Sequence, residues 1–209
     1  MKFVEIKELY FPEVKVIGYA RFCDNRGYFT EHFRKSDILS LEFLKGFDFV
    51  QCNESYSRPG TIRGLHFQWA PYQGKLVRTV YGRMVDLVMD IRKGSPTFGT
   101  IIAYNMPSGE ERDYGEWIWV PPGFAHGNFY TETTKIEYFC TGEYNPATEA
   151  GISPLSEDID WSKCDDRLRS EFKDVLNRGA RISEKDQRGY SLSQWLKDSR
   201  SENFIYGKL

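Results

Sequence analysis

The stretch that decides the fold is Ile62-Arg63-Gly64-Leu65-His66-Phe67-Gln68, followed by Trp69-Ala70-Pro71-Tyr72-Gln73-Gly74 and then Lys75. Its first seven residues predict a strand, the Pro- and Gly-containing segment predicts a turn, and Lys75 opens a return strand. His66, one of only three histidines in the chain, lies in the middle of the first strand. A histidine and a lysine on neighbouring strands can remove a proton from carbon and hold the charge left behind, so this stretch also predicts a catalytic site.

Short apolar segments separated by turn residues continue on both sides of this stretch. Strands are expected around residues 3–6, 14–22, 28–33 and 47–55, and again around 76–80, 84–91, 98–104, 117–120, 125–130 and 134–144. So many short strands at this spacing predict an all-β sandwich or barrel. A short helix with Ser36 as its N-cap is expected to interrupt them.

The pattern changes after Pro146. Leu168, Phe172, Val175 and Leu176 recur at helical spacing, and a second short helix is expected near Ser193. The length of 209 residues suits one domain. We therefore predict a single domain over 1–209, with a strand-rich core over about 1–161 and a helical cover over 162–209.

Composition excludes several classes of function. The net charge is −2 and no basic run exceeds two residues, so nucleic acid is not an expected partner. No apolar run reaches membrane length, and the first residues lack the core of a signal peptide. The four cysteines form no CxxC pair, so we expect reduced thiols that fill the core of a cytoplasmic protein.

The residues around His66 bear on whether its role is catalytic or structural. Strict alternation puts Ile62, Gly64, His66 and Gln68 on one face and Arg63 on the other, so Arg63 and His66 can meet one ligand only if a bulge occurs at Gly64. A hydrogen-bonded core histidine is the plain alternative for His66, and a solvated side chain is the plain alternative for Lys75.

Two carboxylates and a second histidine extend the candidate site. Asp86 and Asp90 lie within an apolar strand and therefore need partners, for which Lys75, Arg78 or His126 are available. A metal-binding jelly roll would carry a histidine near 126 and an earlier HxH pair, but here that pair reads His66-Phe67-Gln68. Two imidazoles without a third suitable ligand make a poor transition-metal site, so we expect no metal.

The ordered motifs resemble those of the dTDP-4-dehydrorhamnose 3,5-epimerases, which are cupin-type nucleotide-sugar epimerases. The matching segments cover most of residues 20–161 and are Asp24–Gly27, Asn53–Ser55, Ile62–Gln68, Gln73–Arg78, Asp90–Gly99 and Pro122–Gly127. The resemblance implies a cupin jelly roll with short C-terminal helices. It also implies a homodimer whose N-terminal strands pack on the partner, and it implies no metal and no organic cofactor.

Roles for single residues come from this resemblance, because periodicity alone leaves Tyr138 as a core aromatic and Asp186 as a loop carboxylate. The family's base matches His66, the carboxylate that orients it matches Asp186, the lysine that stabilises the enolate matches Lys75, and the tyrosine acid matches Tyr138. Arg26 and Arg63 match arginines that hold the diphosphate, and Glu31, Gln51, Asn53 and His126 match other pocket positions.

The activity implied is inversion of C3 and C5 of a nucleotide-activated 4-keto-6-deoxyhexose, in the synthesis of rhamnose-type precursors of polysaccharides. The chain departs from the family where Glu143-Tyr144 replaces two aromatics and where Ser153–Ser156 replaces a Trp-Asn-Asp segment, and its tail after Tyr190 is longer. The nucleotide is therefore open between dTDP, CDP and GDP. A mono-epimerase acting at C3 or C5, a non-catalytic sugar-binding jelly roll and a metal-dependent oxygenase are the other hypotheses.

Overall fold

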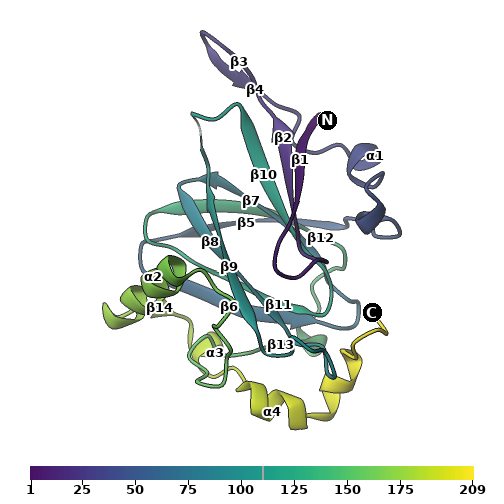
Figure 1. Ribbon diagram of the computed structural model, residues 1–209, viewed down its shortest axis with the longest axis vertical. Coiled ribbons are helices and arrows are strands. Elements are labelled where there is room, and N and C mark those ends of the chain that lie inside the picture. Colours follow the sequence, from purple (N-terminus) through teal and green to yellow (C-terminus); the bar gives the residue numbers. More distant parts are fainter. Residues whose placement is uncertain (110) are drawn as a thin grey trace.

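Two packed β-sheets form the body of the protein, as the computed structural model of residues 1–109 and 111–209 shows (Figure 1). The first sheet has the order β1 (Phe3–Glu8), β2 (Lys15–Ala20), β10 (Tyr114–Val120), β7 (Lys75–Tyr81), β12 (Thr134–Cys140) and β5 (Gln51–Ser57). The second has the order β13 (Glu149–Gly151), β6 (Thr61–Gln68), β11 (Phe124–Phe129), β8 (Arg83–Asp90) and β9 (Ile101–Pro107), and β14 (Arg181–Ile182) pairs with β6. A separate hairpin of β3 (Phe22–Asp24) and β4 (Gly27–Phe29) extends from one end. The predicted all-β fold class is confirmed.

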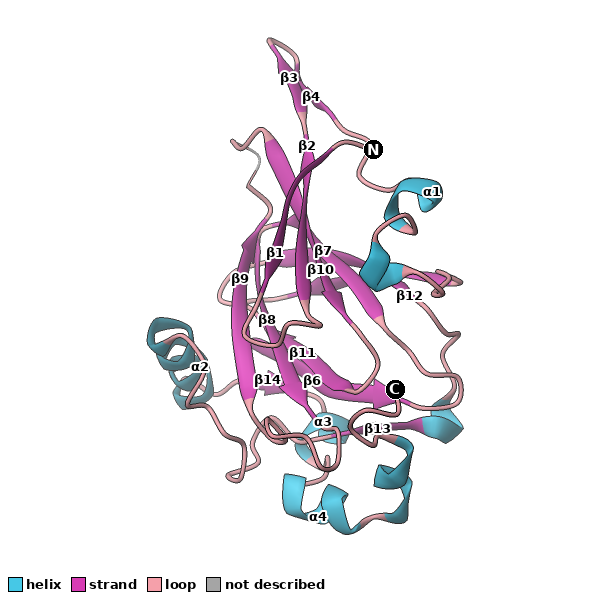
Figure 2. Ribbon diagram, turned by 45° about the vertical axis from the view of Figure 1, so that its right-hand side comes forward, coloured by secondary structure: helices cyan, strands magenta, loops and turns pink. Residues whose placement is uncertain are grey.

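Short helices accompany the sheets (Figure 2). They are α1 (Lys35–Ile38), α2 (Asp166–Asn177), α3 (Glu184–Gln187) and α4 (Leu192–Lys197), with 3-10 turns η1 (Glu42–Leu44), η2 (Pro146–Thr148) and η3 (Ser199–Asn203). Helix α2 buries Leu168, Phe172 and Val175, so its predicted apolar face is confirmed. The predicted cap at Ser36 is wrong, because α1 begins one residue earlier and Arg34 stands at its N-cap without a side-chain bond.

Apolar side chains cover both faces of each sheet. A cluster that includes Val77, Val88 and Ile118 fills the space between the sheets. A second cluster packs α2, α4 and η3 on the outer face of the second sheet. A third is built on Trp117 and Trp119, and residues of the segment 33–49 pack against it on the outer face of the first sheet. A polar cavity between sheets packed in this way needs specific hydrogen bonds to persist inside the molecule.

Strand β6 contains the bulge that the sequence predicted on the condition that Arg63 and His66 meet one ligand. In its pairing with β11, His126 lies opposite His66 and Asn128 lies opposite Arg63, so three steps along β6 match two steps along β11. The extra residue falls at Gly64, whose φ is +104°, and such an insertion reverses the alternation of side chains. The bulge at Gly64 is therefore confirmed. The predicted grouping of Ile62 with His66 is wrong, because Ile62 packs in the core with Leu65 and Phe67.

Some strand ends and two cysteines differ from expectation. Strand β4 ends at Phe29 and β12 ends at Cys140, whereas the strands were expected to run to 33 and 144. Beyond Cys140 the backbone turns to other partners, with the Tyr144 amide donating to Gln51 Oε1 at 2.8 Å. All four cysteines are free, but Cys23 and Cys52 are exposed and fill no core.

Among the described residues, no helix has the length and apolar character that crossing a membrane requires.

The bulge predicts a specific sensitivity to substitution. An added Cβ at Gly64 would lie 2.5 Å from Gly127 Cα and 2.7 Å from the His126 carbonyl oxygen, so Gly64→Ala combines a disfavoured φ with a backbone clash. We expect it to lower the free energy of unfolding by at least about 3 kcal/mol, as measured by urea denaturation. Gly94→Ala is the matched control, because Gly94 has a φ of +83° and its Cβ would meet nothing within 4 Å. Equal losses in the two variants would contradict this account of the bulge.

Candidate active site

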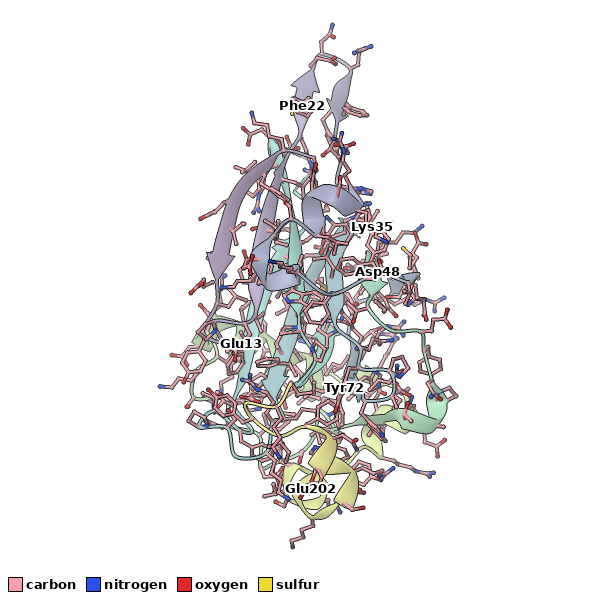
Figure 3. The ribbon with its side chains drawn as sticks, turned by 90° about the vertical axis from the view of Figure 1, so that its right-hand side faces the viewer. Glu13, Phe22, Lys35, Asp48, Tyr72 and Glu202 are labelled. Carbon is pink, nitrogen blue, oxygen red and sulfur yellow. The ribbon has the colours of Figure 1, made fainter. Side chains whose placement is uncertain are left out.

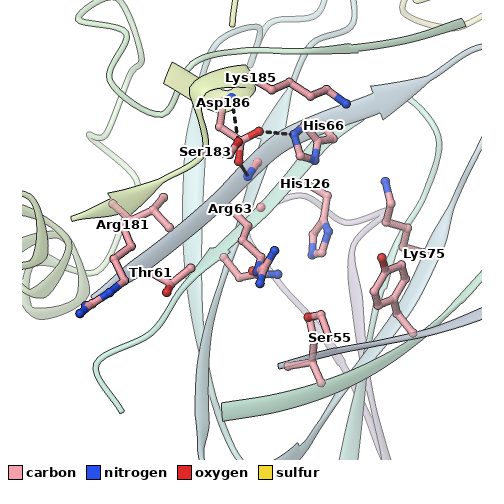
Figure 4. Close-up of a pocket in the computed structure, with 16 residues that line it drawn as sticks. Ser55, Thr61, Arg63, His66, Lys75, His126, Arg181, Ser183, Lys185 and Asp186 are labelled. Atoms are coloured by element: carbon pink, nitrogen blue, oxygen red, sulfur yellow. Dashed lines mark hydrogen bonds and ion pairs between the residues drawn. The ribbon is translucent and has the colours of Figure 1, made fainter. Parts of the chain in front are cut away.

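A polar cavity of about 340 Å³ lies between the two sheets. Strands β6 and β11 form one wall, strands β5, β7 and β12 form the other, and β14 and α3 close one side. A second cavity of about 340 Å³ adjoins it and shares His66, Lys75 and Tyr138 with it. These three side chains therefore stand where the two cavities meet. Figure 4 shows His66 and Lys75 among the residues that line the first cavity.

His66 is held by Asp186, although the two residues are 120 positions apart in the chain. His66 Nε2 lies 2.8 Å from Asp186 Oδ1, and the Gly64 amide donates to Asp186 Oδ2 at 3.2 Å. Burial raises the pKa of Asp186, but the hydrogen bond and charge of His66 and the Gly64 and Ser183 hydrogen bonds outweigh it, so the net shift of that pKa is downward. An ionised Asp186 accepts a hydrogen bond from Nε2–H, and this leaves Nδ1 as the basic nitrogen of the ring.

Lys75 begins β7 beside this pair. Burial holds the pKa of Lys75 below its ordinary value, and the charges of Cys140, Glu149 and Asp86 act in the opposite direction. Within the described part of the chain, Lys75 Nζ has no ion-pair partner within 4.0 Å. When it is protonated, Lys75 is available to a negative charge that develops in the cavity.

Tyr138 reaches the cavity from the other sheet. On β12 it lies opposite Val77 of β7 and opposite Asn53 of β5. Burial raises the pKa of Tyr138 above its ordinary value, so the phenol keeps its proton at neutral pH and can donate it.

His126 and Asp86 form a second buried pair. His126 Nε2 lies 2.7 Å from Asp86 Oδ2, so His126 is the partner that the sequence left open among three candidates. Burial raises the pKa of Asp86, against the charges of His126 and Lys75. Asp90 does not take any of the predicted partners, because Arg92, Ser95 and Thr97 in the following loop bind its carboxylate.

The two histidines are not arranged as metal ligands. They face each other across β6 and β11, but each uses Nε2 to contact its own carboxylate. Among the described residues, no group of three or more His, Cys, Asp or Glu side chains is placed to hold a metal ion.

The predicted binding residues divide into two sets. Arg63 lines the first cavity and is oriented by Ser57 Oγ, which accepts from its Nε at 3.0 Å. Gln51 and Asn53 line the second cavity and contact each other at 3.0 Å.

Arg26 and Glu31 lie outside both cavities of the chain that carries them. Arg26 sits at the tip of the β3–β4 hairpin, paired with Asp24, and Glu31 pairs with Arg34 and the amino terminus. Figure 3 shows this hairpin, marked by Phe22, at the opposite end of the molecule from Glu202. A single chain therefore does not bring these two residues to the site.

Sequence reasoning missed several side chains that line the cavities. Ser55, Asn128, Tyr144, Glu149 and Lys185 belong to this set. Asn128 could have been found by alternation from His126, because the two lie on the same face of β11. Glu149 and Lys185 carry no periodic signal, since both belong to elements of only three or four residues.

Comparison with known proteins agrees with this geometry. The family model for dTDP-4-dehydrorhamnose 3,5-epimerase matches residues 8–194. A dTDP-4-dehydrorhamnose 3,5-epimerase of Shigella flexneri is 38% identical over 154 residues, which are 72% of this chain and 82% of that protein. One from Escherichia coli K12 is 32% identical over 197 residues, covering 92% and 94% of the two chains.

A solved structure gives the same result for the fold. It is a dTDP-6-deoxy-D-glucose-3,5-epimerase from Legionella pneumophila Philadelphia 1 in complex with dTDP-4-keto-L-rhamnose. It superposes on this chain with a TM-score of 0.79 and 31% identity, covering 96% of this chain and 97% of that one. The motifs, the site and the matched length agree, and the chain belongs to the dTDP-4-dehydrorhamnose 3,5-epimerase family.

Proposed function

We propose that this protein inverts C3 and C5 of a nucleotide-activated 4-keto-6-deoxyhexose of the dTDP-4-dehydro-6-deoxy-D-glucose type, in the synthesis of a rhamnose-type sugar precursor. The observation that carries the proposal is the meeting of three groups at one cavity between the sheets. These are a histidine fixed by a carboxylate, a half-buried lysine with no ion-pair partner among the described residues, and a neutral phenol.

The first step is removal of a proton from carbon. The 4-keto group acidifies the hydrogens on C3 and C5, and Nδ1 of His66 accepts one of them while Asp186 stabilises the imidazolium that forms. The electron pair of the broken C–H bond moves onto the ketone oxygen as an enolate. The Lys75 ammonium stabilises that oxygen, and its partial burial strengthens the interaction.

The second step is return of a proton from the opposite face. His66 projects from β6 of the second sheet and Tyr138 from β12 of the first, so a ring bound between the sheets has one group on each side. Tyr138 donates its proton to the carbon and the ketone re-forms, which inverts the centre. No group is oxidised or reduced in this exchange, and Lys75 supplies the positive charge for the enolate oxygen, so we propose that the reaction uses no organic cofactor and no metal.

Two carbons flank the C4 ketone, and the same groups serve both if the ring presents each carbon in turn. Arg63 on the cavity wall is placed to bind the diphosphate, with Gln51, Asn53 and His126 contacting other parts of the substrate. We propose dTDP as the nucleotide. Tyr144 lines the second cavity and is the remaining aromatic of the pair that the family usually carries there.

We further propose that the active form is a homodimer in which the N-terminal strands pack on the partner. Strand β1 is an exposed edge of the first sheet, with Val4 56% and Ile6 43% accessible, and the hairpin exposes Phe29 at 71%. Exposed apolar side chains on an unpaired edge strand favour association. In a two-fold dimer, the hairpin of one chain would carry Arg26 and Glu31 towards the cavity of the other. A cytoplasmic location is proposed as well, and the four free cysteines support it.

The role of His66 is testable by isotope exchange. In D2O with the 4-keto sugar nucleotide, His66→Asn should lose both deuterium incorporation and inversion by roughly 10²–10⁴-fold, as expected for loss of a general base. Asp186→Asn should show a smaller loss of the same two activities, because the base remains but its tautomer is no longer fixed. Proton NMR of substrate and product measures both. Wild-type exchange by His66→Asn would remove His66 as the base.

Tyr138 should separate exchange from inversion. In Tyr138→Phe, His66 still forms the enolate, so deuterium should enter the recovered substrate while inverted product accumulates slowly. The wild-type product should carry deuterium at both C3 and C5. Deuterium at a single carbon would identify a mono-epimerase instead, absence of exchange in the wild type would favour a sugar-binding protein, and inversion by Tyr138→Phe at the wild-type rate would exclude Tyr138 as the acid.

Complementation tests whether Arg26 acts in the partner's site. His66→Asn and Arg26→Ala chains should each be weakly active, whereas a heterodimer contains one site with both residues intact. Random remixing should therefore restore about a quarter of wild-type activity, since half of the dimers are mixed and each has one good site. Arg188→Ala in place of Arg26→Ala is the control, because Arg188 is an exposed arginine at the C-cap of α3 that lines neither cavity. If mixing leaves activity at the level of the single variants, Arg26 does not act across the dimer.

A further inference from the structure

An ion pair between Glu149 and Lys185 spans the rim of the active site. Glu149 begins β13 and lies opposite Gln68 of β6, and Gly151, two residues later, lies opposite His66. The Glu149 side chain is only 12% exposed. Its Oε2 accepts hydrogen bonds from Lys185 Nζ and, at 3.1 Å, from the Tyr144 hydroxyl. The Lys185 side chain is 58% exposed, so the contact joins a largely buried carboxylate to a cation at the edge of the cavity.

Lys185 connects this carboxylate to the helix that carries Asp186. Helix α3 has four residues, Glu184–Gln187, so side-chain contacts must fix its position. Asp186 anchors it to His66 and Gly64, and Lys185 anchors it to Glu149. In Figure 4 the Lys185 side chain extends along the site beside His66.

Lys185 also adds a positive charge to the cavity that the proposed base lines. The ionisable groups that line the first cavity with His66 are Arg63, Lys75, His126, Tyr138, Arg181, Lys185 and Asp186. Those that line the second cavity are Glu54, Lys75, Tyr138, Tyr144 and Glu149. Positive charge predominates in the first set, and Glu149 supplies the negative charge that pairs with Lys185.

We propose that Glu149 is a positioning residue for the base: it fixes α3 through Lys185 and balances the charge of Lys185 beside the His66–Asp186 pair. The proposal rests on the proposed role of His66. Proton abstraction makes an imidazolium at His66, and an unbalanced ammonium nearby would oppose that charge. With Glu149 in place, His66 faces a neutral pair at this rim in addition to its own carboxylate.

The state of Lys185 supports the pairing. Burial lowers the pKa of Lys185, but the hydrogen bond and the charge of Glu149 outweigh it and the net shift of that pKa is upward. Lys185 thus remains an ammonium at working pH and its charge needs a counter-ion.

Charge-changing variants test the proposal through the titration of His66. The chain has three histidines, so three ring Cε1–Hε1 signals are expected in an NMR titration of the whole protein, and the His66→Asn variant identifies that of His66. Glu149→Gln should move the titration midpoint of His66 to lower pH and Lys185→Met should move it to higher pH, each by about half a pH unit after solvent screening. Glu149→Gln combined with Lys185→Met should return the midpoint close to the wild-type value, and Lys185→Arg should leave it unchanged.

Glu184→Gln is the matched control, because it removes one negative charge from α3, the helix that carries Lys185. Glu184 pairs with Arg188 at the surface, and both side chains are more than 70% exposed, so the midpoint of His66 should not move. A shift in Glu184→Gln as large as in Glu149→Gln would overturn the proposal. So would shifts of the same sign, or no shifts, in Glu149→Gln and Lys185→Met.

The same variants should move the acidic limb of kcat/KM in the directions of the NMR midpoints, a change that a merely structural contact would not produce. The titration needs no substrate, so it tests the role of Glu149 independently of the proposed epimerase activity. If the wild type exchanges no deuterium with the sugar nucleotide, the proposed function fails while opposite NMR shifts still uphold the role of Glu149. If exchange occurs and the midpoints do not move, only the inference about Glu149 fails.

Discussion

The β-bulge at Gly64 is the constraint on which the active site depends. Without the extra residue, Arg63 and His66 would point to opposite faces of β6, and one of them would lie in the apolar layer under α2 and α4. The bulge also frees the Gly64 amide from the ladder, and that amide donates to Asp186 Oδ2. One irregularity thus directs the base into the cavity and provides a second anchor for the carboxylate that orients it.

Close packing explains why glycine is required there. The backbone of β11 passes so near that a Cβ at Gly64 would overlap Gly127, and a Cβ at Gly127 would in turn lie 2.5 Å from the Arg63 carbonyl oxygen. Two glycines facing each other across β6 and β11 let the strands approach, and this approach sets His66 opposite His126. Each histidine then takes its own carboxylate, from α3 in one case and from β8 in the other.

The parts that the sequence predicted are those governed by local pattern. Alternation and turn residues located the strands, and the position of Lys75 at the start of the strand after His66 followed from the Pro71–Gly74 turn. The bulge could be stated only as a condition, because a single sequence does not say that Arg63 and His66 must share a ligand.

The partner of Asp90 was assigned to distant strands, yet Arg92, two residues away, binds its carboxylate. The chain turns after the strand, and this turn brings the donor groups of the next residues back to Asp90. Asp186 had no local signal at all: only the tertiary fold brings it across 120 residues, and it entered the prediction through resemblance.

Residues 195–209, the tail beyond the range that the family model matches, pack on the face of β6 that points away from the cavity. The family model ends at residue 194, and immediately afterwards Trp195 and Phe204 are fully buried against Phe67, at ring-centroid distances of 4.7 and 5.3 Å. Phe67 is the neighbour of His66 and points to the opposite face of the strand, so the tail supports the base from behind while α3 holds it in front. Burying two aromatic rings is worth several kcal/mol, which is far more than an exposed ion pair contributes. The tail therefore stabilises the packing behind the strand, and the charged contacts at the front are left to set the orientation and charge of the imidazole.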